Sequence, residues 1–349
     1  MPIMTRFLAL RFAKSLGLVV LIVSGIIFAT SFMQDIAGAP SVPAALSLSL
    51  SHFFELFPMF LPLAAFIGTL LAFYRLLVSS ELVIVQSAGW SAYKIMRPML
   101  WVSLSFGMLA AMVINPIGAN YDLESKINSK IEKIDDAVWL REKTGDGAII
   151  IRSVNLNSAG DGLDFVDAAI LRQNAAFQIE ERVDAKVLSL RGGRLSAKGA
   201  AILSKDGALR TADWSADTTL TGENVMKRYL KTNQVSFWEL PGFIAALRGM
   251  GAGTDAHLMQ FLSLLFLPLV MVSMCVMGAL FSQTRERRNF SFAKKFGFGI
   301  LACFVVYFVI QIFSAMGSSG AMPPLVAALA PPAIVLFLSA SGIIRAENK

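Results

Sequence analysis

Few side chains in this chain are of the types that catalyse reactions, and their spacing does not assemble a catalytic site. The 349 residues include two histidines, His52 and His257, and two cysteines, Cys275 and Cys303. Neither histidine lies in a motif with a nucleophile, and no Cys/His cluster has the spacing of metal ligands. A Walker phosphate-binding loop occurs nowhere in the sequence. We therefore expect no enzymatic activity and no metal or cofactor site in this chain.

One short polar segment is suited to binding a partner. Ser79 or Ser80 can cap a short helix, and Glu81 suits the positive N-terminus of such a helix. Gly89 can end it. A capped helix with one acid near its start predicts a docking site for a soluble protein. The alternative is a helix that only turns the chain, with Glu81 as its dipole partner.

A second polar feature lies inside an apolar stretch, where Tyr307 and Gln311 are one helical turn apart. The other long apolar stretches carry almost no ionisable residues, which argues against ion-coupled transport. His52 and Glu55 lie near the end of one stretch and are interpreted as interfacial rather than as proton relays. A cavity with such walls would suit a lipid-like substrate, and the alternative for its aromatic residues is ordinary packing. The aromatic candidates for the cavity wall are Phe28, Phe32, Phe60, Phe66, Phe304 and Phe308.

Six apolar stretches must position these residues. The chain is 55% apolar, with a mean hydropathy of +0.62, outside the range of soluble domains. A membrane-spanning helix needs about 20 apolar residues. The first stretch also resembles a signal peptide, but it is too long, and we expect it to be retained. The predicted spans are residues 15–33, 56–74, 98–116, 258–281, 296–316 and 323–344.

The distribution of charge predicts the orientation of these spans. Outside residues 118–257 there are 13 Lys and Arg against five Asp and Glu, whereas residues 118–257 contain 18 and 19. The 13 basic residues lie before the first span, between spans two and three, between spans four and five, and after span six. The positive-inside rule therefore predicts that both termini are cytoplasmic and that residues 118–257 lie outside.

The polar block of residues 118–257 is predicted to be an all-β domain. Turn signals recur at Gly145-Asp146-Gly147, Gly160-Asp161-Gly162, Arg191-Gly192-Gly193-Arg194 and Lys205-Asp206-Gly207. Short strands at that spacing predict an antiparallel sandwich or open roll. The block has no cysteine, so no disulfide stabilises it. Its edges are expected to be helical: residues 121–134 continue the third span, and residues 237–247 lie at the membrane interface or pack on the sheet.

In order along the chain, several motifs resemble those of the LptF/LptG family of lipopolysaccharide export permeases. The segment Ser80-Glu81-Leu82-Val83 with Gln86-Ser87-Ala88-Gly89-Trp90-Ser91 is similar to the coupling helix of that family. Further similar motifs are Ser24-Gly25-Ile26-Ile27, Phe57-Pro58-Met59, Lys231-Thr232-Asn233, Tyr307 with Gln311-Ile312-Phe313, Pro323-Pro324 and Ala330-Pro331. The Lys-Thr-Asn and Pro-Pro motifs favour the LptG branch.

The resemblance implies a permease subunit of an ABC transporter in the inner membrane of a Gram-negative bacterium. Residues 1–117 would form three spans with the coupling helix at 79–89, residues 118–257 a periplasmic β-jellyroll-like domain, and residues 258–349 three more spans. The implied partners are an LptF-like permease, a dimer of an LptB-like ATPase that uses ATP and Mg²⁺, and an LptC-like periplasmic protein. Ser80, Glu81, Leu82, Gln86 and Gly89 would contact the ATPase, and Tyr307 and Gln311 would line the lipid cavity.

The sequence departs from the family pattern at one place. LptG proteins often carry lysines after the Ser-Gly-Ile-Ile motif, whereas residues 28–35 contain none. Either the partner permease supplies the positive charge, or the lipid here carries fewer or masked phosphates. Two other interpretations remain: a sister LptF or a permease for another large lipid, and a membrane scaffold or sensor that does not transport.

Overall fold

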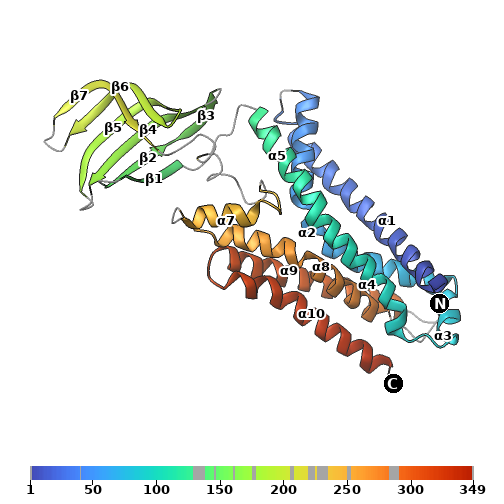
Figure 1. The fold of residues 1–349 in the computed structure, drawn as a ribbon. Coiled ribbons are helices and arrows are strands. Elements are labelled where there is room, and N and C mark those ends of the chain that lie inside the picture. The colour runs from blue at the N-terminus through green and yellow to red at the C-terminus, as the bar shows by residue number, and fades with distance from the viewer. Residues whose placement is uncertain are drawn as a thin grey trace. The chain divides into compact units, whose positions relative to one another are not determined.

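The computed structural model divides into two units, and each is described by itself. One unit is helical and comprises Met1–Asp122 and Lys231–Lys349, and the other comprises Leu123–Leu230. Figure 1 shows the helices of the first unit and the strands of the second. The structure describes residues 2–39, 41–128, 138–144, 147–159, 162–174, 178–204, 208–218, 225, 235–249, 253–282 and 291–347.

Six helices of the helical unit are long and apolar enough to cross a membrane, which confirms the predicted six spans. They are α1 (Pro2–Asp35), α2 (Val42–Val78), a third span made of α4 (Ala92–Leu109), η1 (Ala110–Ile114) and α5 (Asn115–Asn128), α8 (Asp255–Ser282), α9 (Ser291–Ser318) and α10 (Pro324–Glu347). Two shorter helices, α3 (Glu81–Ser87) and α7 (Leu240–Gly249), lie between spans. α7 packs against α8 and belongs to the helical unit.

The span α8 forms the centre of the helical unit, since it contacts α2, α4, α9 and α10. Glycines allow this close approach. A Cβ atom on Gly107 of α4 would lie 2.6 Å from the Cα atom of Pro268 in α8. A Cβ atom on Gly278 of α8 would lie 2.9 Å from the carbonyl oxygen of Phe66 in α2. Small residues of this kind let membrane helices pack backbone to backbone.

The third span contains a π-helical turn that the sequence did not predict. In this turn, η1, the regular pattern of i to i−4 hydrogen bonds is interrupted, and such turns often mark functional sites. The Trp238 indole donates a hydrogen bond to the carbonyl oxygen of Met112 at 3.0 Å. The backbone N–H of Phe237 donates to Oδ1 of Asn115 at 3.0 Å. Phe237 and Trp238, which precede α7, are therefore hydrogen-bonded to the third span at and just after its π-helical turn.

The second unit is an antiparallel sheet inserted between the third and fourth spans, as predicted. Its strand order is β1-β2-β4-β5-β6-β7, and β3 pairs with β4. Of the predicted turn signals, residues 191–194 lie wholly within the described part of the chain, and Gly192 and Gly193, with φ of +55° and +74°, form the turn between β5 and β6. Residues 145–146, 160–161 and 205–207 of the other three signals lie outside the described residues. The strands are β1 (Val138–Thr144), β2 (Gly147–Ser153), β3 (Asn155–Ala159), β4 (Gly162–Asn174), β5 (Ile179–Arg191), β6 (Arg194–Ser204) and β7 (Leu209–Asp217).

A bulge bends this sheet around its own core. In β6 the buried positions change from Leu195 and Ala197 to Ala200 and Ile202, so the alternation shifts by one residue. The register between β6 and β7 shifts at the same place, between Ala197 and Ala200. Gly199, at the bulge, has φ of +59° and donates its N–H to Oδ1 of Asp213 at 2.8 Å. The bulge keeps apolar side chains inward on both sides of the bend.

Candidate functional site

A cavity of about 540 Å³ lies within the helical unit. Its lining residues come from α2, α5, α8, α9 and α10. Two prolines of α2, Pro58 and Pro62, are in the lining. Met59 of the lining is 42% exposed, so the cavity is open at that side. The size and the mixed walls are those of a small-molecule or acyl-chain site.

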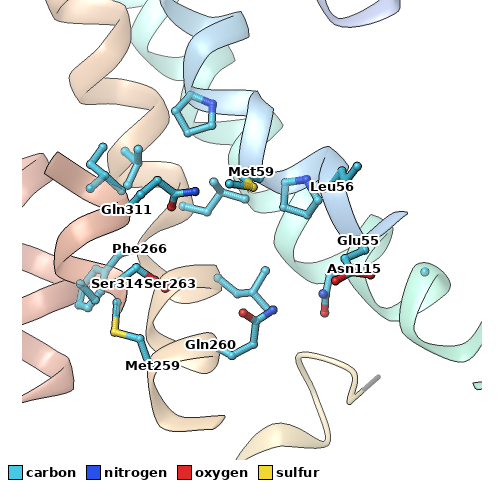
Figure 2. Close-up of a pocket in the computed structure, with 18 of the residues that line it drawn as sticks. Glu55, Leu56, Met59, Asn115, Met259, Gln260, Ser263, Phe266, Gln311 and Ser314 are labelled. Carbon is cyan, nitrogen blue, oxygen red and sulfur yellow. The ribbon is translucent and has the colours of Figure 1, made fainter. Parts of the chain in front are cut away.

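The cavity has a polar tier among apolar walls. Apolar residues, among them leucine, methionine, phenylalanine, proline and alanine, form most of the lining. In the view of Figure 2, Glu55 and Asn115 are on the right of the cavity, Gln311 and Ser314 on the left, and Gln260 below. Among the described residues of the lining, Glu55 is the single carboxylate, and none is Lys, Arg or His. The polar tier comprises Glu55, Asn115, Gln260, Ser263, Gln311 and Ser314.

Two amide side chains of this tier are hydrogen-bonded, and the bond of Asn115 also fixes the orientation of its amide. Asn115 is 8% exposed, and its Oδ1 accepts the Phe237 N–H, so its amide nitrogen cannot exchange places with the oxygen. Gln311 donates from Nε2 to the Tyr307 hydroxyl at 3.2 Å. Asn115 therefore retains a free N–H₂ donor among the described residues, and Gln311 retains one free amide group, its carbonyl or its N–H₂.

The structure brings two of the eight predicted cavity residues into this lining, Tyr307 and Gln311. The six phenylalanines lie elsewhere. Phe66 is fully buried and contacts Phe281 edge to face, while Phe304 and Phe308 are 48% and 65% exposed. Phe28 and Phe32 stack on each other along α1, with ring centroids 6.3 Å apart, and Phe60 is half-buried on α2. None of the six therefore lines this cavity, and their contact with lipid stays a prediction.

Most of the polar tier was missed by the sequence analysis, although a signal was present. Gln311 and Ser314 are three residues apart, as are Gln260 and Ser263, and residues at that spacing share one face of a helix. Polar stripes of this kind within apolar spans indicate a lined cavity. Asn115 could not be recognised in this way, because its role depends on Phe237, 122 residues away along the chain.

The helix α3 packs on an apolar core, and its first residue, Glu81, forms an ion pair with α1. Leu82 and Val85 are 7% and 2% exposed and belong to a buried cluster with Leu8 and Phe12 of α1. Arg11 of α1 donates a hydrogen bond to Oε1 of Glu81. Oε2 of Glu81 is buried and has no hydrogen-bond partner among the described residues. Ile84, on the opposite side, is 61% exposed.

The predicted capping of α3 is partly wrong. The Ser79 hydroxyl donates to the Arg75 carbonyl at 2.8 Å, so Ser79 closes α2 and does not cap α3. Ser80 has φ of +61°, and its carbonyl oxygen accepts the Ile84 N–H. Gly89 follows the helix with φ of +79°. The side chain of Gln86 and the motif residues 231–233 lie outside the described residues.

Comparisons with known proteins cover both units. Residues 6–345 match the family described as lipopolysaccharide export system permease LptF/LptG. Lipopolysaccharide export system permease protein LptG of Escherichia coli strain K12 is 22% identical over 299 residues, 80% of this chain and 80% of the relative. The LptG protein of Haemophilus influenzae strain Rd is 25% identical over 293 residues, 80% of this chain and 79% of the relative. The match includes the spans, the inserted sheet and the α3 segment.

Proposed function

This chain belongs to the LptF/LptG family of lipopolysaccharide export system permeases, and we propose that it is the LptG-type subunit of an ABC transporter. It extracts lipopolysaccharide from the inner membrane and passes it to a periplasmic bridge. The observation that carries this proposal is the cavity, whose apolar walls and polar tier suit an amphiphile. The curated relatives, both LptG proteins, support the choice of branch.

The proposed subunit works only as part of a complex. A Walker motif is absent from the sequence, so ATP and Mg²⁺ would be used by a separate LptB-like ATPase dimer. An LptF-like permease would supply the other half of the transport cavity. An LptC-like protein would receive the lipid on the periplasmic side, where the sheet unit guides it or docks that protein.

The proposed orientation has both termini and α3 on the cytoplasmic side. Figure 1 places N, C and α3 at one end of the helical unit. Arg6, Arg11, Lys14, Arg75 and Lys94 precede or surround α3 along the chain, which supports a cytoplasmic position for that end. The sheet unit, inserted after the third span, would then be periplasmic.

The helix α3 is proposed to be the coupling element. It is short, is bound to the spans through Leu82 and Val85, and leaves Ile84 exposed for a partner. Because Arg11 binds Glu81, a displacement of α3 by the ATPase would pull on α1 as well as on α2. Coupling between distant sites is transmitted by packed helices that can adopt two discrete conformations.

Purification of the complex tests the proposed function. A tag on this chain is expected to co-purify a second permease, the ATPase dimer and lipopolysaccharide, with ATP releasing the lipid. Ser263→Phe, which fills the cavity, is expected to lower the bound lipid, whereas Leu338→Phe, on an exposed position of α10, leaves it unchanged. A scaffold would co-purify without lipid and would show no response to ATP.

A further inference from the structure

The polar tier of the cavity differs from an anion site. Phosphate groups are bound by arginine, lysine or helix N-termini, and no described residue of the lining has a cationic side chain. Glu55 instead places a negative charge at the cavity. A phosphate held here would lose hydration and face a carboxylate without a compensating charge, which is strongly unfavourable.

The tier instead offers neutral donors and acceptors in fixed positions. Asn115 presents its N–H₂ group because Phe237 occupies its oxygen. Gln311 is hydrogen-bonded to the Tyr307 hydroxyl, and because a hydroxyl both donates and accepts, the Gln311 amide can present either its carbonyl or its N–H₂ group to a ligand. Ser263 of α8 contributes a hydroxyl to the same lining. Asn115 is more than nine-tenths buried, and its N–H₂ group remains accessible to a ligand or to water.

From this arrangement we infer that the cavity binds the uncharged hydrogen-bonding zone of a glycolipid, the hydroxyl, amide and ester groups between its sugars and its acyl chains, and leaves the phosphates outside. Such groups both donate and accept, as the tier requires, and the adjoining acyl chains suit the apolar walls. The inference rests on the proposed function and specifies which part of the lipid this chain contacts. It also accounts for the absence of lysine from residues 28–35, because this chain then needs no cation to recognise the lipid.

Asn115→Asp is the variant that tests the inference most selectively. An aspartate keeps the acceptor for the Phe237 N–H but replaces the free donor with a second acceptor. Asn174→Asp is a matched control, since Asn174 also accepts a backbone N–H, from Gln178 at 2.9 Å, but lies in the sheet unit. Ser263→Ala is a second variant, with Ser273→Ala as its control, because the Ser273 hydroxyl is buried on the same helix and donates to Val270.

The experiment uses the complete complex in phosphatidylcholine vesicles, with a photoreactive phenylalanine analogue at Phe266 of the lining. The probes are lipid A with both phosphates and the same lipid A after dephosphorylation. We expect the wild-type complex to capture both lipids equally. We expect Asn115→Asp and Ser263→Ala to lower capture of both about tenfold, the value of one hydrogen bond, and both controls to leave it unchanged.

Two outcomes overturn the inference in distinguishable ways. If capture requires the phosphates, or if Asn115→Asp and Ser263→Ala do not affect it, the inferred binding of the uncharged zone is contradicted. The proposed function as a lipid permease is not contradicted by either result. Failure of the wild-type complex to capture either lipid contradicts the inference and the proposed function together. Membrane levels of each variant, measured in parallel, show that the protein is folded.

Discussion

Arg11 of α1 and Glu81 of α3, 70 residues apart along the chain, form an ion pair between the first span and the short helix. The pair leaves Oε2 of Glu81 buried and without a partner among the described residues. A buried acceptor of this kind is stabilised when a donor reaches it. Glu81 is therefore both fixed by α1 and able to accept one further hydrogen bond.

A comparison of two substitutions separates these roles of Glu81. If the ATPase donates to Glu81, then Glu81→Gln lowers the affinity of the complex for the ATPase by about tenfold to a hundredfold, the value of a charge-assisted hydrogen bond. Arg11→Gln, which removes only the partner on α1, is expected to have the smaller effect. Glu81→Lys adds repulsion from Arg11 and is expected to abolish association. Quantitative pull-down of the ATPase measures its association with each of the three variants. Equal effects of Glu81→Gln and Arg11→Gln would show that Glu81 acts only through its ion pair with Arg11 and does not bind the ATPase.

Trp238 is expected to stabilise the π-helical turn of the third span. Trp238→Phe keeps an aromatic ring but removes the donor to Met112, and we expect a loss of about 1 kcal/mol in the free energy of unfolding. Trp101→Phe is the control, because Trp101 and Trp238 are exposed to similar extents, 60% and 62%. Thermal unfolding in detergent measures the difference. Equal melting temperatures for the two variants would show that the hydrogen bond does not hold the turn.

Gly107 is expected to tolerate no side chain. Gly107→Ala places a methyl group against the Pro268 backbone, and backbone atoms of a helix cannot move aside locally. We expect this overpacking to lower the free energy of unfolding by about 1–3 kcal/mol. Gly17→Ala adds the same methyl group to α1, where no atom lies within 4 Å, and should not destabilise the protein. Unfolding of both variants in detergent provides the measurement. A neutral Gly107→Ala would contradict the close packing of α4 on α8.

Asp213 is expected to hold the bulge that bends the sheet. Asp213→Ala leaves the Gly199 N–H without its acceptor, and we expect strands β6 and β7 to open more easily by about 1 kcal/mol. Asp184→Ala is the control, since its ion pair with Arg182 is half-exposed on both sides and contributes little. Amide hydrogen exchange of the full chain measures the local opening. Unchanged exchange in Asp213→Ala would show that the bulge is held by other contacts.

The spans and the inserted sheet were predictable because their signals are local. Apolar runs and glycine-rich turns can be read from neighbouring residues, and each predicted span overlaps one of the six long helices. The helix ends were not predictable in the same way. The first span was expected at residues 15–33, whereas α1 is Pro2–Asp35, because a hydropathy pattern marks only the part that crosses the hydrocarbon core.

The cavity was only partly predictable because its geometry depends on distant contacts. Tyr307 and Gln311 are polar residues one turn apart and could be recognised together. Asn115 acquires its role through Phe237, and the Arg11–Glu81 pair joins two segments that no local pattern relates. The six phenylalanines were selected by residue type, which does not determine the direction in which a helical side chain faces.

The most direct test of the central claim, that this chain moves lipopolysaccharide out of its cavity, is ATP-dependent photocrosslinking in the reconstituted complex. One photoreactive residue replaces Met59, which lines the cavity, and another replaces Trp214, which belongs to the apolar core of the sheet unit. The account predicts that lipopolysaccharide is captured at Met59 without ATP, and that ATP lowers this capture and raises capture at Trp214. Absence of capture at Met59, or capture there that ATP does not change, would contradict it.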